Sequence, residues 1–273
     1  MKTSQIEADF LYCENIIRKH SVRFYRAFSR LPHEKSNAVY AIYAFCRMAD
    51  DCVDENTSSI DKQRELNQLH SELDLFSKKQ ELDLPLWRAL RHVFNQYEMD
   101  LQLFYDQLKG QRMDINFTPP KTMLELEKYS YYVAGSVGLM LLPIIASESW
   151  RTLKQPAIDL GIAMQITNIL RDIGEDFQEK KRIYLPEMEL RRYQYYVEDL
   201  NAGIINKSFI SLWESLASRA EELYENFYTH VRKFDRDSQV PVYLSALAYR
   251  RILNSVRKND YDCLSKRNYI VKE

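Results

Sequence analysis

Glycine and proline, the residues on which tight turns depend most, are scarce in this sequence. Only 6 of the 273 residues are glycine and 8 are proline, which is well below average usage. A protein built from many short strands needs many tight turns and therefore these two residues. The composition argues against an all-β fold and predicts a mostly helical protein.

Long apolar runs, cysteine pairs and a surplus of charge are missing as well. No window reaches the roughly 18 apolar residues of a membrane span, and the opening MKTSQIEADF has acidic residues where a signal peptide needs an apolar stretch. The formal net charge is −1, which gives no basic field for nucleic acid. Because no CxxC pair occurs, we expect neither disulfides nor zinc at Cys13, Cys46, Cys52 and Cys263. We expect a cytoplasmic protein without nucleic-acid partners.

Helical periodicity runs through almost the whole chain, and its breaks fall at prolines that precede or open a helix. The segment from Val133 to Ala146 is too short to span a membrane and contains Pro143, so it is expected to be a buried, kinked core helix. No break in composition divides the chain, and a single all-α bundle over residues 1–273 is expected. The pattern predicts helices near residues 4–19, 21–30, 35–55, 60–79, 85–109, 122–147, 151–178, 187–196, 206–235 and 239–258.

A first stripe of charged residues follows an apolar segment. Residues 38–46 are apolar all round, as in a helix buried on every side. Tyr43, Arg47, Asp50 and Asp54 follow the spacing i, i+4, i+7 and i+11 and therefore share one helix face. A buried helix is thus predicted to end in a pair of carboxylates.

A second stripe consists of Asn168, Asp172 and Asp176, spaced i, i+4 and i+8 after another apolar helix. Carboxylates near the C-terminal end of a helix are opposed by the helix dipole, each by about 0.3–1 kcal/mol, and they also repel one another. Two solvated acidic faces are the plain alternative, but two such pairs on largely apolar helices favour a bound cation. Oxygen ligands without His or Cys suit Mg²⁺, which one or two carboxylates typically hold together with substrate phosphates.

These residues resemble a known family. The stretch Ala-Ile-Tyr-Ala-Phe-Cys-Arg-Met-Ala-Asp-Asp-Cys-Val-Asp, together with Asn-Ile-Leu-Arg-Asp-Ile-Gly-Glu-Asp-Phe and the later Arg-Ile-Tyr-Leu-Pro, is similar to the squalene and phytoene synthases, the head-to-head prenyl diphosphate synthases. His20-Ser21 with Phe24, the stretch from Tyr129 to Gly138, and Tyr249 also match. The similarity covers nearly the whole chain and looks strongest to bacterial dehydrosqualene (4,4'-diapophytoene) synthases, enzymes of carotenoid biosynthesis.

The resemblance implies an all-α isoprenoid synthase fold around a central cavity and two or three Mg²⁺ ions bound by five side chains, namely Asp50, Asp54, Asn168, Asp172 and Asp176. It implies a catalytic role for the four aspartates and Tyr129. Substrate contacts are implied for His20, Phe24, Phe28, Tyr43, Arg47, Val133, Val137, Gly138, Gln165, Asn168, Arg171, Tyr249 and Arg267, with Arg182 as a further phosphate contact. Many relatives have Lys then Ser after the His-Ser pair. Val22 and Arg23 stand there in this chain, so that contact is either lost or supplied by Arg23.

Several of these residues also have a plain structural interpretation. Gly135 and Gly138 lie inside a helical pattern, where each costs up to about 1 kcal/mol relative to alanine. Tight helix packing or a ligand channel would explain them equally well. Phe24 and Phe28, at i and i+4, would ordinarily be core residues, and the resemblance places them on the cavity wall.

The implied reaction condenses two farnesyl diphosphates through a cyclopropylcarbinyl (presqualene) diphosphate to a C30 triene. No GxGxxG occurs, which favours the route without NADPH, although squalene synthases also lack that motif. Squalene or phytoene synthesis, a phosphatase that uses the same metal site, and a non-catalytic helical assembly factor remain alternatives. Chain length, oligomeric state and peripheral membrane contact for release of an oily product stay open at this stage.

Overall fold

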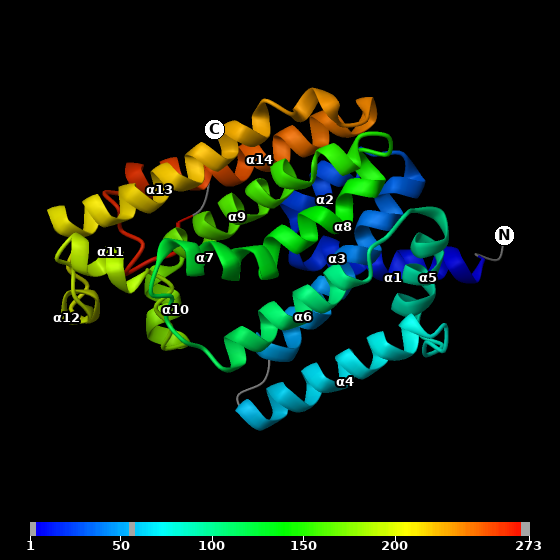
Figure 1. Ribbon diagram of the computed structural model, residues 1–273, viewed down its shortest axis with the longest axis horizontal. Coiled ribbons are helices and arrows are strands. Elements are labelled where there is room, and N and C mark those ends of the chain that lie inside the picture. The colour runs from blue at the N-terminus through cyan, green and yellow to red at the C-terminus, as the bar shows by residue number, and fades with distance from the viewer. Residues whose placement is uncertain (1–3, 55–57, 269–273) are drawn as a thin grey trace.

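The computed structural model describes residues 4–54 and 58–268, and every regular element in these ranges is helical (Figure 1). The α-helices are Gln5–His20 (α1), Val22–Phe28 (α2), His33–Asp54 (α3), Ser59–Ser77 (α4), Pro85–Gln96 (α5), Gln102–Ile115 (α6), Met123–Ser130 (α7), Ser136–Ile145 (α8), Lys154–Arg171 (α9), Ile173–Glu179 (α10), Glu187–Arg192 (α11), Val197–Asn201 (α12), Lys207–Tyr228 (α13) and Arg236–Lys258 (α14). Three short turns complete the list: a π-helical turn at Tyr131–Gly135 (η1) and 3₁₀ turns at Trp150–Thr152 (η2) and Val231–Lys233 (η3). The prediction of an all-α protein is confirmed.

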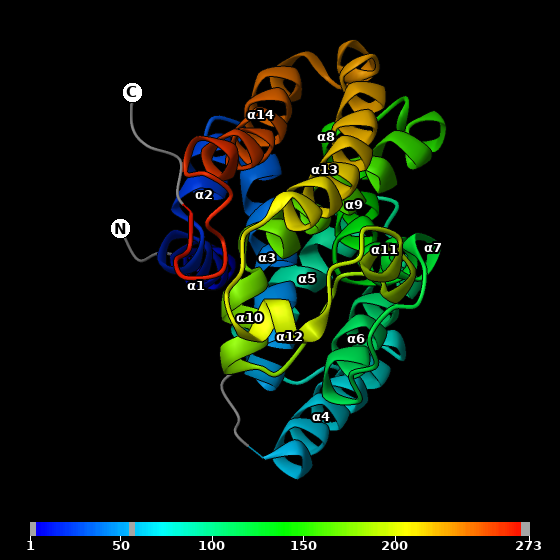
Figure 2. The same cartoon turned by 90° about the vertical axis from the view of Figure 1, so that its left-hand side faces the viewer.

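Helix α9 lies at the centre of the bundle and packs against α13, α14, α8 and η1. Helix α3 forms a second packing centre, in contact with α1, α5, α8 and α6. Figure 2 shows that α2 and α14, which come from opposite ends of the chain, lie side by side. The two helices that carry the aspartate stripes therefore belong to two packing groups joined by α8.

Local signals explain several helix starts. Ser4 and Glu7 form a capping box at α1, in which the Ser4 hydroxyl accepts from the Glu7 amide and the Glu7 carboxylate accepts from the Ser4 amide. Pro85 opens α5 in the first turn, where a missing amide hydrogen costs nothing. Thr122 and Asn206 cap α7 and α13 with side-chain oxygens.

Five predicted helices differ from the observed ones in where they break or end. The helix expected over 85–109 splits into α5 and α6, because Tyr97 is extended and the Asp100 carboxylate accepts from the Gln102 amide to start α6. The helix expected over 122–147 contains η1, and the one over 151–178 breaks at Asp172. The helix expected over 206–235 ends at Tyr228, and that over 187–196 ends at Arg192.

The remaining sequence predictions have mixed outcomes. The end of the 35–55 helix, Glu55, lies outside the described residues. The four cysteines are buried and form no disulfide. Each helix in the described part of the chain is too short or too polar to cross a bilayer.

Candidate active site

An apolar cavity of about 350 Å³ opens between α3, α8, α9, α2 and α14. One end is polar and carries His20, Asp50, Gln165, Asn168 and Tyr249 among its lining residues. At the other end of the same helices the lining is apolar, with Phe28, Leu142, Ile145, Phe234 and Val242. From Ala157 to Asn168 the wall formed by α9 rises about 16 Å, a length comparable to a prenyl chain of three isoprene units.

The polar end continues into a chamber of about 220 Å³, the polar chamber, whose lining is almost wholly polar. Both aspartate stripes open into it. Helices α3 and α9 each place their C-terminal ends at this chamber, and α10 continues from α9 after Asp172. Its acidic and amide side chains are Asp50, Asp54, Gln111, Asp114, Gln165, Asn168, Asp172 and Asp176, and its cations are Arg171, Lys180 and Arg182.

Asp50 lies deepest among the carboxyls of the first stripe. Its Oδ1 accepts a 2.5 Å hydrogen bond from the Gln111 amide. Burial raises its pKa to about 7, and the negative charge of Asp54 adds to the rise while Arg47 opposes it. A nearby cation would stabilise the charged form of this carboxyl and return its pKa toward the ordinary range.

The second stripe survives the helix break at Asp172. The amide of Asp176 donates to the Asp172 carbonyl at 2.9 Å, which keeps Asp176 one turn beyond Asp172. Burial raises the pKa of Asp176 to about 6, against the attraction of Lys180. Asp172 is held from two sides, since Arg171 Nε donates to it at 2.7 Å and Arg267 Nε lies 3.2 Å away.

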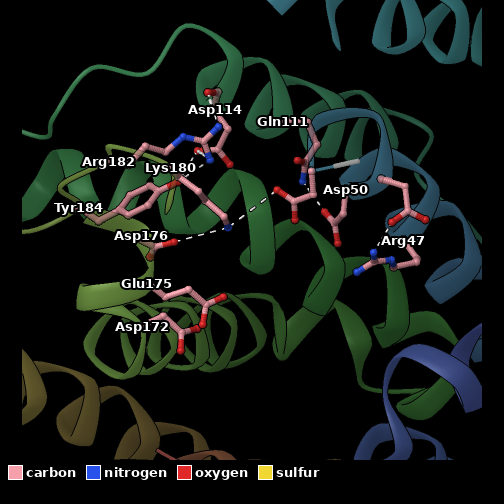
Figure 3. A network of polar contacts seen from close by, with 12 residues as sticks. Arg47, Asp50, Gln111, Asp114, Asp172, Glu175, Asp176, Lys180, Arg182 and Tyr184 are labelled. Carbon is pink, nitrogen blue, oxygen red and sulfur yellow. Dashed lines mark hydrogen bonds and ion pairs between the residues drawn. The ribbon is translucent and has the colours of Figure 1, made fainter. Parts of the chain in front are cut away.

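A buried cluster around Asp114 forms the far wall of the polar chamber (Figure 3). The Tyr184 hydroxyl donates to Asp114 Oδ1 at 2.7 Å, and the Tyr129 hydroxyl donates to both carboxylate oxygens at 3.0 and 3.1 Å. The two rings stack with centroids 5.2 Å apart, and Arg182 donates to the Asp114 carbonyl at 2.7 Å. Burial raises the pKa values of Asp114 and Tyr129. The sequence analysis named Tyr129 but missed Asp114 and Gln111.

Arg47 is the sequence prediction that fits the site least well. Its spacing placed it on the face of Asp50, but its guanidinium pairs with Asp51 and lines neither the apolar cavity nor the polar chamber (Figure 3). Its Nε is buried without a hydrogen-bond partner among the described residues. Arg267 likewise lies outside the chamber lining; it pairs with Asp172, which lines the chamber, and with Glu175, which does not.

The remaining substrate-binding candidates lie around the two connected spaces. Phe24, Phe28, Tyr43, Val133, Val137 and Gly138 all line the apolar cavity. Phe24 and Phe28 contact each other with ring centroids 4.6 Å apart. Burial raises the pKa of Tyr249, and the charges of Arg171, Arg23 and Arg267 oppose that rise. Arg23 therefore contributes positive charge near the mouth, as expected if it supplies a phosphate contact.

Of the two glycines inside the helical pattern, Gly138 lines the apolar cavity and Gly135 does not. A Cβ on Gly138 would lie 2.7 Å from the Ala157 carbonyl oxygen, so Gly138 allows close packing of α8 on α9 while it also lines the cavity. Gly161 plays the same part against η1, where a Cβ would lie 2.6 Å from the Ala134 oxygen. The sequence analysis did not single out Gly161.

The donor set fits magnesium that arrives with a diphosphate. In the described ranges, no three carboxyl, imidazole or thiol groups converge closely enough to hold a metal ion unaided. Mg²⁺ usually keeps water and binds one or two carboxylates plus substrate phosphates. Asp50, Asp54 and Asp176 would hold it from the protein side, with Asn168 and Asp172 beside them.

An apolar cavity in an all-α protein, with aspartates from two helices at its mouth, is the arrangement of an isoprenoid synthase. A family model described as squalene/phytoene synthase matches residues 17–273. The chain belongs to this family, whose members are prenyltransferases that join two prenyl diphosphates head to head.

Three relatives place the chain within the family. The 15-cis-phytoene synthase of Synechococcus elongatus is 35% identical over 270 residues, which cover 94% of this chain and 87% of that protein. The chloroplastic phytoene synthase 1 of Zea mays is 35% identical over 266 residues, covering 95% of this chain and 64% of that protein. A crystal structure of a dehydrosqualene synthase in complex with ligand has 44% sequence identity and a TM-score of 0.89, covering 96% of this chain and 91% of that chain.

Proposed function

We propose that this protein condenses two molecules of farnesyl diphosphate to dehydrosqualene, with Mg²⁺ and without NADPH. The observation that supports this choice of product is the apolar end of the cavity, where Phe28, a residue only 2% exposed, is one of the lining residues. The 44% identity to a dehydrosqualene synthase, against 35% to the two phytoene synthases, supports the same branch.

The reaction balances without a reductant. The C1 atom of one farnesyl group, losing its diphosphate, bonds to the double bond of the second, and proton loss closes a cyclopropane. Loss of the second diphosphate, ring opening and loss of another proton then give a C30H48 hydrocarbon with a conjugated triene at its centre. Two diphosphates and two protons leave in total, and no hydride is consumed. Squalene would need one hydride in place of the second proton loss.

The residues of the chain would divide this work between the two ends of the cavity. When bound, magnesium would neutralise the leaving diphosphate. Arg171, held by Asp172, offers a planar guanidinium to phosphate oxygens, and His20 lies at the mouth. The apolar wall would fold the prenyl chains and keep water from the cation, which would otherwise be lost to an alcohol.

Product analysis tests the proposal. Purified protein incubated with farnesyl diphosphate and Mg²⁺, with and without NADPH, should give the C30 triene in both cases by mass spectrometry. Squalene formed only with NADPH would reject the non-reductive branch, and farnesol as the main product would favour a phosphatase.

Metal dependence is tested separately. EDTA should abolish turnover, and so should Asp50→Asn or Asp172→Asn while circular dichroism still reports the helical fold. Asp61→Asn, on the exposed face of α4 with a side chain 40% exposed, should keep full activity as the matched control. Activity that survives EDTA would contradict the magnesium assignment.

A further inference from the structure

One cation spans the two aspartate motifs. Lys180 Nζ lies 3.5 Å from Asp176 Oδ1 and 3.8 Å from Asp54 Oδ1 (Figure 3). Asp54 is the last residue of α3, whereas Asp176 belongs to α10. The Lys180 ammonium therefore bridges the helices that carry the first and second motifs.

The backbone holds Lys180 at this position. Its amide donates to the Asp176 carbonyl at 3.2 Å as the C-cap of α10, and the next residue, Lys181, reverses the chain with a φ of 54°. The amide of Arg182 returns to the same carbonyl at 3.0 Å. Only the long side chain of Lys180 is free to leave, and it is 36% exposed.

The other carboxyls of the polar chamber have partners of their own. Asp114 has Arg182 at 3.6 Å and two tyrosine hydroxyls, and Asp172 has Arg171 and Arg267. The carboxyls of the two motifs that face each other across the chamber, Asp54 and Asp176, meet at Lys180. A divalent cation shared by both motifs would compete with Lys180 for these two carboxyls.

We propose that Lys180 is a built-in placeholder for magnesium: its ammonium links Asp54 to Asp176 in the empty site and is displaced when Mg²⁺ binds. The inference rests on the proposed magnesium site. It assigns Lys180 a positioning role, because the lysine preserves the spacing of the two motifs and sets the metal concentration at which they are filled. An internal cation that occupies the site for most of the time reduces the association constant for metal to its intrinsic value multiplied by the fraction of time the site is open.

The test is a calorimetric titration with Mg²⁺ in the presence of inorganic diphosphate, at the same diphosphate concentration for the wild type and every variant. Lys180→Met, which keeps the length of the side chain but removes its charge, should bind Mg²⁺ about three- to tenfold more tightly than wild type, as expected if the lysine fills the site 70–90% of the time. The metal-free variant should also unfold at a lower temperature than wild type, and saturating Mg²⁺ should remove that difference.

Lys181→Met is the matched control. Lys181 is the adjacent, exposed lysine, and its replacement by Met removes the same charge. Its Mg²⁺ affinity should stay within twofold of wild type. An equal gain in both variants would show a general charge effect and overturn the proposal, as would unchanged or weaker binding in Lys180→Met.

Asp176→Asn separates failure of this inference from failure of the metal site. If Asp176→Asn weakens Mg²⁺ binding and Lys180→Met leaves it unchanged, the site stands and the placeholder role is rejected. If Asp176→Asn binds Mg²⁺ as wild type does, the proposed metal site is wrong and the placeholder role is rejected with it.

Discussion

At the scale of single residues, Asp50 combines burial with negative neighbours. Burial and the charge of Asp54 raise its pKa to about 7, although Arg47 opposes the rise and Gln111 donates to its carboxylate. A carboxylate that the metal-free protein tolerates poorly is well suited to bind a cation, because binding removes the conflict.

The pH dependence of stability follows from this shift. The folded protein holds the Asp50 proton more tightly than the unfolded chain, so its contribution is full below about pH 4 and is lost as the pH rises to about 7. Asp50→Asn mimics the protonated form. In metal-free buffer, denaturant titrations should find the variant more stable than wild type by on the order of 2–4 kcal/mol at pH 8, and by much less at pH 4. A stability difference independent of pH would show that Asp50 is not buried against charge.

Phe28 is expected to limit the length of the prenyl chain. Phe28→Ala would leave a void at the apolar end of the cavity, so the ratio of kcat/KM for C20 geranylgeranyl diphosphate to that for C15 farnesyl diphosphate should rise. The variant should also lose about 3–5 kcal/mol of stability, as core phenylalanines do on truncation. Phe104→Ala, a fully buried ring that does not line the cavity, should lose stability without changing the ratio. A ratio equal to wild type in Phe28→Ala would remove Phe28 from the cavity floor.

At the scale of elements, the π-helical turn η1 positions the catalytic wall. π-turns insert an extra residue into a helix and often occur at functional sites. Here η1 contains Val133, which lines both the apolar cavity and the polar chamber, and it follows directly on the helix that ends after Tyr129. It packs on α9 through Gly161.

Gly161→Ala tests this packing. Its new methyl would lie 2.6 Å from backbone atoms of η1, which cannot rotate away, so the variant should lose about 1–3 kcal/mol of stability and much of its activity. Gly110→Ala meets a methyl group of Val133 at 2.8 Å and backbone atoms of η1 only at 3.1 Å, so it should be less destabilised. Thermal unfolding of both variants gives the comparison. Equal stability of Gly161→Ala and wild type would mean that η1 can move away from α9.

Elements also show where sequence reasoning succeeded and why it stopped. The aspartate stripes could be predicted from the sequence because the helical period sets their spacing. That spacing is kept even across the helix break at Asp172. Gln111 and Asp114 were missed because the predicted helix ended at residue 109, and their burial depends on packing against other helices. The Lys180 bridge joins residues far apart in the chain and leaves no local pattern. Arg47 shares a face with Asp50, but its long side chain bends to Asp51 one turn on.

At the scale of the whole molecule, the polarity of the cavity lining changes from apolar to polar along several helices of the bundle at once. Along the chain, α3, α9 and α14 pass from apolar residues at one end of the cavity to polar residues at the mouth, whereas α2, and η1 followed by α8, run the opposite way. Two diphosphates can then lie at the aspartates while their prenyl chains share one water-free space. The helices would thus hold the reacting carbons together and keep the charged diphosphates at the mouth of the cavity.

The most direct measurement of this account is the product formed when both substrates compete. Wild-type protein would be given equal concentrations of farnesyl and geranylgeranyl diphosphate with Mg²⁺ and no reductant, and the hydrocarbons extracted and analysed by mass spectrometry. The account predicts that C30H48 predominates and that EDTA removes it. A C40 hydrocarbon as the main product, or prenyl alcohols without any coupled hydrocarbon, would contradict it.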